Sequence, residues 1–308
     1  MPLSTWQCFQ TTAFPYQEIP PCVNSYCYGS PFCGLVSLLP GRPESSRNHF
    51  LRLSDYPGAI DTEATGITPS GEIVGRYISS DGFLHGFLLS KGNFYPINVP
   101  KALGESVNDI NPSGQVVGAY LGQDGIVHGY VLRDRKYTTI DYPGASYTSC
   151  DGIGADGEIV GEESGQDGLI HGFLLDKKGM FTLVEYPGAP QSLLTQISAG
   201  RMIGDYLPDP STVYAFVVKN GRFQSFGFPG CKASYVSGLN PQGDIVGGCI
   251  SNFLDEDGYL RSNGQFISIK MPGWNSCFAN DINPQGQIVG RYSINDGRLN
   301  HGFLLTWK

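Results

Sequence analysis

The sequence is poor in charge, because only 16% of its 308 residues are Asp, Glu, Lys or Arg. Acidic side chains outnumber basic ones by 28 to 20, so the formal net charge is −8. A chain with this balance lacks the positive surface on which binding to nucleic acid or to anionic lipid headgroups depends. We therefore expect neither nucleic acid nor a membrane among its partners.

Long apolar runs and helix-forming segments are also missing. No apolar stretch approaches the roughly 20 residues of a membrane helix, and the stretch Gly34 to Leu39 is far too short. The 42 glycines and 21 prolines are too many for helix interiors. The glycines follow no collagen period, and a hydrophobic fraction of 40% is enough for a buried core. The composition predicts a globular all-β protein.

The first 48 residues differ from the rest in composition. They contain many prolines and aromatic residues, only four charged side chains, and half of the eight cysteines: Cys8, Cys22, Cys27 and Cys33. No Cys-x-x-Cys knuckle is present, which favours disulfides over zinc. The positively charged start of a signal peptide is absent from this chain. We predict a disulfide-linked cap at residues 1–48 and a location in the secretory pathway or outside the cell.

The remainder of the chain repeats itself. An Ile-Val-Gly type triplet that ends at Gly75 returns every 43 residues, ending at Gly118, Gly161, Gly204, Gly247 and Gly290. Around these anchor glycines lie Asn-Pro-x-Gly turns, Asp-Gly turns and corners such as Tyr56-Pro57-Gly58. The segments between the turns are short and rich in β-branched and aromatic residues, which is typical of strands. Each repeat therefore predicts four strands and four turns.

A four-stranded repeat of this length has the size of one propeller blade. Six anchors predict a single six-bladed β-propeller of four-stranded blades over residues 49–308. Residues 49–58 look like the last strand of a repeat, whereas the chain stops after Leu305 without that strand. We expect the N-terminal strand to complete the last blade and close the ring, which removes exposed sheet edges. An open solenoid or another blade count is the alternative.

The repeat resembles the HAF-type repeat, a blade-like unit named for a His-Ala-Phe triplet. The triplet reads His85-Gly86-Phe87, His171-Gly172-Phe173 and His301-Gly302-Phe303, and two repeats depart from it with Tyr214-Ala215-Phe216 and Asp257-Gly258-Tyr259. This resemblance implies an architecture and no chemistry. A second resemblance, carried by no single motif, is to fungal propeller-like pericyclases, the hetero-Diels–Alderases of tropolone sesquiterpenoid biosynthesis. It implies a cofactor-independent cyclase.

Four histidines recur at one position of the repeat: His85, His128, His171 and His301. Equivalent positions of different blades lie far apart, so these side chains do not converge on one metal ion. We predict a structural role, in which each ring nitrogen binds a turn carbonyl of its own blade. The Asp-Gly turns lack the spaced oxygen ligands of a calcium site. We expect neither a metal nor a cofactor.

The repeats differ most just after the Pro-Gly corner, where the chain crosses to the innermost strand of the next blade. Positions that differ between repeats are not needed to build a blade and are available for function. In a propeller these segments surround one mouth of the central channel. They carry the apolar residues Tyr147, Tyr235, Trp274, Phe278, Leu103, Leu193 and Leu194 and the polar residues Asp61, Glu63, Glu105, Gln191, Lys232 and Asn275. This mixture is typical of a small-molecule pocket, although loops also vary where nothing constrains them.

Two functions remain open, since the sequence contains no nucleophile elbow, Walker loop, dinucleotide fingerprint or zincin helix. In the first, a cyclase or pericyclase holds an apolar substrate in a near-attack geometry. The candidate catalytic residues are then Lys232, Glu63, Glu105 and Tyr147, and the candidate substrate-binding residues are Trp274, Asn275, Tyr235, Phe278, Gln191 and Asp61. The alternative is a non-catalytic secreted propeller that binds a ligand or a glycan. A lectin more often repeats its site in every blade, whereas this mouth is irregular, which favours one asymmetric pocket.

Overall fold

The computed structural model describes residues 49–52, 55–165, 167–252, 255–270, 273–294 and 299–306. All of these residues belong to the unit Ser45–Lys308. The predicted cap at residues 1–48 and its four cysteines lie outside the described residues. All regular elements of the described segments are β-strands, as predicted from the composition.

No helix in the described part of the chain is long and apolar enough to cross a membrane.

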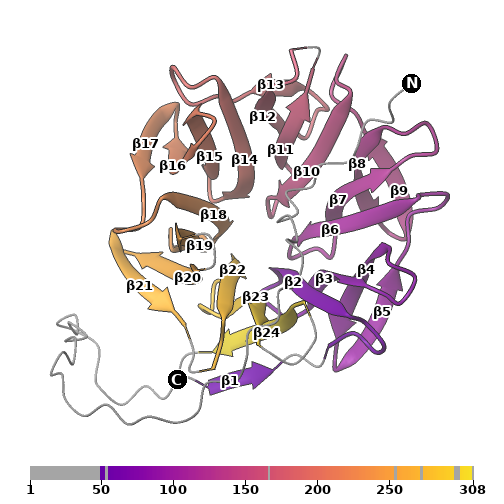
Figure 1. Ribbon diagram of the computed structural model, residues 1–308. Coiled ribbons are helices and arrows are strands. Elements are labelled where there is room, and N and C mark those ends of the chain that lie inside the picture. Colours follow the sequence, from indigo (N-terminus) through magenta and orange to yellow (C-terminus); the bar gives the residue numbers. More distant parts are fainter. Residues whose placement is uncertain are drawn as a thin grey trace, which may run out of the picture. The chain divides into compact units, whose positions relative to one another are not determined.

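The strands follow one another in antiparallel sets of four, which we number in chain order (Figure 1). One parallel pairing joins sets 2 and 3, and another joins sets 4 and 5, into eight-stranded sheets. Sets 1 to 3 comprise β2 (Asp61–Ile67), β3 (Ile73–Ile78), β4 (Leu84–Ser90) and β5 (Asn93–Ile97); β6 (Gly104–Ile110), β7 (Val116–Leu121), β8 (Val127–Arg133) and β9 (Lys136–Ile140); and β10 (Tyr147–Ile153), β11 (Ile159–Ser164), β12 (Ile170–Leu175) and β13 (Phe181–Leu183). Sets 4 and 5 comprise β14 (Gln191–Ser198), β15 (Arg201–Asp209), β16 (Thr212–Lys219) and β17 (Arg222–Phe226); and β18 (Ala233–Leu239), β19 (Ile245–Asn252), β20 (Asp255–Ser262) and β21 (Gln265–Ile269).

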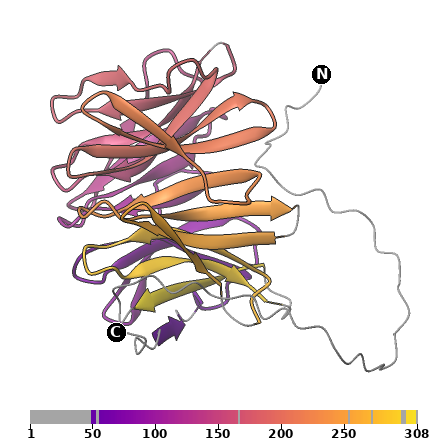
Figure 2. The same cartoon turned by 90° about the vertical axis from the view of Figure 1, so that its left-hand side faces the viewer.

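Set 6 combines the two ends of the described chain. It contains β22 (Ser276–Ile282), β23 (Ile288–Ser293), β24 (His301–Thr306) and β1 (His49–Arg52), in the order β1-β24-β23-β22. The register of the antiparallel pair runs from His49 opposite Thr306 to Arg52 opposite Phe303. Both views place β1 beside the yellow C-terminal strands (Figure 1, Figure 2). The fourth strand of set 6 is therefore supplied by the other end of the sequence.

The anchor glycines are required by close packing inside each set. A Cβ atom at Gly75 would collide with the backbone oxygen of Glu63 on the first strand and with the ring of Phe87 on the third. The other five anchor glycines meet a first-strand carbonyl oxygen in the same way. The third-strand ring that covers each anchor is fully buried, as at Phe87, Tyr130, Phe173, Phe216, Tyr259 and Phe303. The anchor glycine, the most regular feature of the repeat, is therefore required by packing.

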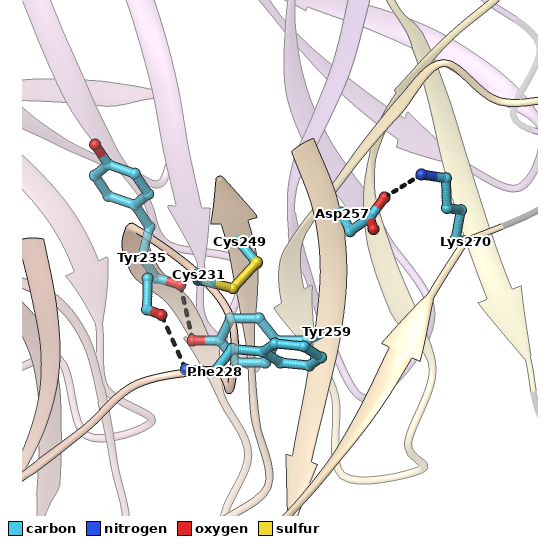
Figure 3. The surroundings of a disulfide bond; sticks show 8 residues. Phe228, Cys231, Tyr235, Cys249, Asp257, Tyr259 and Lys270 are labelled. Carbon is cyan, nitrogen blue, oxygen red and sulfur yellow. Dashed lines mark hydrogen bonds and ion pairs between the residues drawn. A yellow bond between two sulfur atoms is a disulfide. The ribbon is translucent and has the colours of Figure 1, made fainter. Parts of the chain in front are cut away.

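The corner before each first strand is tied to the second strand by different chemistry in different sets. Ring pairs stack with centroids 3.6 Å apart for Tyr56 and Tyr77, 3.8 Å for Tyr186 and Tyr206, and 4.1 Å for Trp274 and Tyr292. In set 5 a disulfide between Cys231 and Cys249 takes this place (Figure 3). Cys150 and Cys277 are buried free thiols. One disulfide of the predicted kind is therefore present within the described residues.

We expect the pairing of β1 with β24 to matter for stability. A chain that lacks residues 1–52 should unfold at a lower temperature than a chain that lacks only residues 1–44, because β24 loses its hydrogen-bonded neighbour and gains an exposed edge. Each large apolar side chain that becomes exposed as a result costs about 1.5–3 kcal/mol. Circular dichroism melting of both truncated chains measures the difference. Equal melting temperatures would show that β1 contributes nothing.

Candidate functional site

The first strands of all six sets contribute to one cavity of about 250 Å³. Each of these strands contains one β-bulge, which falls at Thr65, Asn108, Asp151, Thr195, Ser237 and Asn280. A bulge leaves one residue outside the regular pairing and redirects its side chain. All six bulge residues are polar and line the cavity, together with Glu63, Arg76, Glu162, Leu193 and Gln196. The bulges thus bring one polar side chain from each set to a common space.

Glu63 is the centre of an ion-pair network on one wall of the cavity. Arg76 Nε donates to Glu63 Oε2 at 2.7 Å, and Arg291 Nε lies 3.3 Å from Glu63 Oε1. Asn280 Nδ2 donates to the same Oε1 at 3.0 Å. Burial alone would raise the pKa of Glu63, but the two guanidinium groups hold it below its usual value. Glu63 is therefore an ionised, buried carboxylate at neutral pH.

The network continues through Arg291 to set 5. Its Nη2 atom donates to Glu256 Oε1 at 2.9 Å, and its guanidinium lies 5.3 Å from the ring centroid of Phe278. Arg76 and Arg291 occupy equivalent positions, each directly after an anchor glycine. Because sets 1 and 6 are neighbours in space, these two equivalent arginines meet at one carboxylate.

The wall formed by set 3, across from β2 and β22 in Figure 1, is acidic. Asp151 Oδ1 accepts hydrogen bonds from Asn108 Nδ2 at 3.0 Å and from Ser149 Oγ at 2.6 Å. Glu162 Oε1 accepts one from the hydroxyl of Tyr147 at 2.8 Å. Burial raises the pKa of both carboxyl groups, and the Glu162 charge raises that of Asp151 further. The two walls of the cavity therefore differ in charge.

Three buried side chains follow the bulges of alternate sets: Asp109, Gln196 and Asp281. The amide Nε2 of Gln196 donates to Asp109 Oδ2 at 2.9 Å, although these residues belong to sets 2 and 4. The remaining sets have Gly66, Gly152 and Gly238 at this position. A Cβ atom at these glycines would press on Asp109, Gln196 and Asp281, respectively. The alternation leaves room for three side chains where six would not fit.

The carboxyl groups of Asp109 and Asp281 connect neighbouring sets. Asp109 accepts backbone N–H bonds from Ile110 at 2.7 Å and Ile153 at 2.8 Å. Asp281 accepts them from Ile282 at 2.8 Å and Ile67 at 2.9 Å. Burial raises the pKa of Asp109 to about 6. Burial and then the charge of Asp109 raise the pKa of Asp281 well above its usual value.

Five of the ten predicted catalytic and substrate-binding residues lie at or near this cavity, and Leu193, one of the predicted apolar mouth residues, lines it as well. Glu63 lines it, Tyr147 binds the lining residue Glu162, and Phe278 packs under Arg291. Burial raises the pKa of Tyr235, and the charges of Asp205 and Glu256 raise it further. Asp61 Oδ2 accepts a hydrogen bond of 2.7 Å from Asn300.

The other five predicted site residues do not join them. Trp274 packs on Tyr292 and Phe303 in the core of set 6. Gln191 Oε1 accepts the backbone N–H of Ile170, and Lys232 and Asn275 are exposed. Glu105 is buried between sets and accepts the N–H of Gly86. The segments after the Pro-Gly corner thus form no single site, because successive side chains of a strand point to opposite faces.

Glu105 has a structural counterpart in other sets. At its position Thr62, Thr148, Ser192 and Ser234 each accept the backbone N–H of the corner residue six positions earlier. Burial raises the pKa of Glu105, whereas hydrogen bonds from the backbone of Gly86 and Val99 lower it. Val99 is also six positions earlier, so Glu105 holds the corner of set 2 in place of a hydroxyl.

The four predicted structural histidines have carboxylate partners in their own sets, whereas we expected turn carbonyls. His128 Nδ1 lies 2.8 Å from Asp141 Oδ1 and its Nε2 lies 3.1 Å from Asp124 Oδ2. His171 is held in the same way by Glu185 and Asp167, at 2.6 and 3.0 Å. The ring of His85 lies 3.3 Å from Asp81, and that of His301 lies 2.9 Å from Asp55. A carboxylate partner is the stronger acceptor because it carries a charge.

Sequence reasoning missed the position directly after the anchor glycine. It reads Arg76, Ala119, Glu162, Asp205, Gly248 and Arg291 in sets 1 to 6. The rule that variable repeat positions carry function applies here as well as after the corner. The bulges were missed because a bulge leaves no separate mark in a strand-like sequence.

No protein-family model matches the chain, and no curated protein matches its sequence. Its structure is similar to that of a TolB-like protein from Agrobacterium tumefaciens, with 13% sequence identity and a TM-score of 0.55 over 80% of this chain and 90% of that one. It is similar to AofleA from Arthrobotrys oligospora, with 12% identity and a TM-score of 0.54 over 85% of this chain and 88% of that one. It is also similar to a point mutant of the Aleuria aurantia lectin AAL in complex with Fucα1-6GlcNAc, with 14% identity and a TM-score of 0.51 over 85% of this chain and 96% of that one. These are β-propeller proteins. At such low identity the likeness shows the fold alone: the chain folds as a β-propeller.

The histidine pairs should make stability depend on pH. Burial alone would lower the pKa of His128 and His171, but their carboxylate partners raise it above 6.5. The stabilisation is fully present below the unfolded value near 6.5 and is lost as the pH rises through the raised folded value. We expect His128→Gln to cost about 0.5–1 kcal/mol at pH 6 and much less at pH 9, because its partners are half-exposed. Urea unfolding at both pH values tests this, and an equal cost at both would contradict it.

Asp109 should affect stability in a lower pH range. Its folded pKa of about 6 lies above the ordinary 3.8, so its contribution is fully present below pH 3.8 and is lost as the pH rises through 6. We expect the free energy of unfolding, measured with urea, to fall between pH 4 and pH 6 in the unaltered protein. In Asp109→Asn this fall should be smaller by roughly 1–3 kcal/mol. Parallel profiles would show that the carboxyl group of Asp109 does not titrate in this range.

Proposed function

We propose that the cavity lined by the bulge residues binds one small polar molecule, in a closed six-bladed propeller built from HAF-type repeats. The pairing of β1 with β24 supports the closed ring. So do two contacts between sets 1 and 6, where Thr62 N–H donates to the backbone oxygen of Asn300 and Ile67 N–H donates to Asp281. In such a ring the cavity lies on the axis, where the first strands of all blades meet.

The observation that carries the proposed function is the chemistry of the lining. Of the eleven lining residues only Leu193 is apolar, and the others are carboxyl, guanidinium, amide and hydroxyl side chains. Preorganised polar groups of this kind recognise a ligand by its hydrogen-bond donors and acceptors. A polyhydroxylated or zwitterionic molecule offers both, so it can satisfy the ionised wall at Glu63 and the acidic wall at Asp151 and Glu162.

The size of the cavity limits the ligand. Pockets for drug-sized ligands usually measure about 300–1,000 Å³, and this one measures about 250 Å³. The ligand is accordingly about as large as a monosaccharide or an amino acid. A small charged cavity suits an apolar cyclisation substrate poorly, because the substrate would strip water from the polar lining without replacing its hydrogen bonds. The geometry therefore favours the binding alternative over the pericyclase.

The Cys231–Cys249 disulfide supports a location in an oxidising compartment, because structural disulfides persist in secreted proteins and are rare in the cytosol. We accordingly propose that the ligand is met in the secretory pathway or outside the cell.

Isothermal titration of the full chain with monosaccharides, polyols and amino acids tests the proposal, with an apolar terpene alcohol as the competing class. We expect binding from the polar panel. Asn108→Leu and Ser237→Leu should each weaken it about tenfold or more, since each removes a hydrogen-bonding group and Ser237→Leu also fills part of the cavity. Lys136→Ala, on the exposed outer strand β9, is the control and should leave affinity unchanged.

Two outcomes would overturn the proposal. Binding or turnover of the apolar alcohol with no response to the polar panel would favour the cyclase. Loss of ligand binding in Lys232→Ala, with Asn108→Leu and Ser237→Leu unaffected, would move the site to the segments after the Pro-Gly corner.

A further inference from the structure

The outer part of three sets contains aromatic rings packed in sequence. In set 1 the corner ring of Tyr56 stacks on Tyr77 at 3.6 Å, and Tyr77 lies 5.3 Å from the ring of His85. In set 6 Trp274 and Tyr292 are 4.1 Å apart, and Tyr292 stacks on His301 at 5.2 Å. In set 4 Tyr186, Tyr206 and Tyr214 repeat the arrangement at 3.8 and 5.6 Å. A tyrosine on the second strand is the middle ring in each case.

Set 3 has no middle ring, because Glu163 stands at this position of the repeat. The outer two rings are present as Tyr142 and His171. Tyr142 is left with a tilted contact to Phe173 and an edge contact to Phe181. Burial raises the pKa of Tyr142, and the charges of Glu163 and Glu185 raise it further. The substitution of a ring by a carboxylate leaves part of the stack open.

A hollow of about 450 Å³ lies at this place, lined by Glu163, Gly165, Asp167, His171, Leu183 and Glu185. Glu163 is only 5% exposed. Its carboxylate, which borders the hollow, makes no hydrogen bond and no ion pair with any residue that the structure describes. Its Oε2 and the Oδ1 of Asp167 both lie about 4 Å from the point where a Cβ at Gly165 would stand. Burial raises the pKa of Glu163 and the charge of His171 opposes this rise, but no hydrogen bond or ion pair within the described part of the chain holds the carboxylate, so it is open to a cation in the hollow.

The charge of the hollow is strongly negative. Asp167 and Glu185 bind the two ring nitrogens of His171, and Glu163 adds a third carboxylate. One imidazolium cannot balance three carboxylates, and the lining contains neither Lys nor Arg. Across the described residues, no group of three His, Cys, Asp or Glu side chains has the spacing that a metal ion requires. An organic cation is therefore the better match.

We propose that this hollow binds a guanidinium group, from an arginine side chain or a small guanidine. A guanidinium is planar and stacks on aromatic rings, so it can lie against the imidazole of His171, which lines the hollow, as the Tyr120 ring lies against His128 in set 2. Its fork of N–H donors pairs with carboxylates in a bidentate manner, which satisfies Glu163. An ammonium group carries the same charge but is compact and strongly hydrated, and it cannot stack. This inference does not depend on the ligand of the axial cavity.

Set 2 provides a matched comparison within the same molecule. There His128 has the same two carboxylate partners, Asp124 and Asp141, but Tyr120 occupies the position of Glu163 and stacks on the imidazole at 5.2 Å. The ring signals of His171 and His128 in nuclear magnetic resonance spectra report separately on the two places. Agmatine is the guanidinium probe and cadaverine the ammonium probe, and a Gly-Arg-Gly peptide represents an arginine side chain.

Agmatine should shift the His171 signals saturably and leave those of His128 unchanged, and it should bind about tenfold more tightly than cadaverine. Glu163→Tyr, which restores the middle ring, should abolish the shift. Glu163→Gln keeps the shape of the side chain and should weaken the binding of agmatine about tenfold. It provides the test if Glu163→Tyr fails to fold. If the peptide binds more tightly than agmatine, the guanidinium group comes from an arginine side chain of a protein. If agmatine binds more tightly, it comes from a small free guanidine.

Three results would overturn the proposal. Equal shifts at His171 and His128 would indicate unspecific screening of charge. Equal affinity for cadaverine and agmatine would show that the hollow recognises charge without planarity. Unchanged agmatine binding in Glu163→Gln would show that the unpaired carboxylate has no part in it.

Discussion

The close approach of three strands at each anchor glycine is the constraint on which the rest of the structure depends. At Gly75 and its five equivalents the second strand has no side chain, because a first-strand carbonyl occupies that space, joined by a third-strand ring at every anchor except Gly161. Any other residue would separate the strands. The flanking positions are then fixed in direction, since side chains alternate along a strand. The residue after each anchor points to the opposite face of its set from the anchor position, and this places Arg76 and Glu162 in the cavity lining and Arg291 beside Glu63.

Structure and candidate function therefore use different positions of one repeat. The rings of Phe87 and its equivalents and the anchor glycines build each set and hardly vary. The six bulge residues line one cavity, and two of the variable residues after the anchors, Arg76 and Glu162, join them there, so six similar sets produce an asymmetric cavity. The cavity is kept polar by burial of carboxyl groups, which is tolerated where hydrogen bonds compensate for lost water. Asp109 and Asp281 show this, with two backbone N–H donors each.

Departures from the repeat indicate where single sets gain something of their own. In set 5 a disulfide replaces the stacked pair that ties the corner to the second strand. In set 2 Glu105 replaces a hydroxyl at the corner and still accepts the same kind of N–H bond. In set 3 Glu163 replaces a ring, and here nothing within the described residues compensates for the change. The first two departures conserve a structural contact, whereas the third opens a charged hollow.

The sequence by itself determined the all-β class, the 43-residue repeat with four strands in each unit, and the place of Glu63 among the functional candidates. These features follow from the local preferences of turns, strands and glycine, which can be recognised in the sequence itself. Only the tertiary structure decided that Trp274 belongs to a core, that Lys232 is exposed, and that Arg76 and Arg291 share one carboxylate. The reason is physical: a one-residue bulge changes which face a side chain joins, and residues more than 200 positions apart meet only when the first and last sets are neighbours.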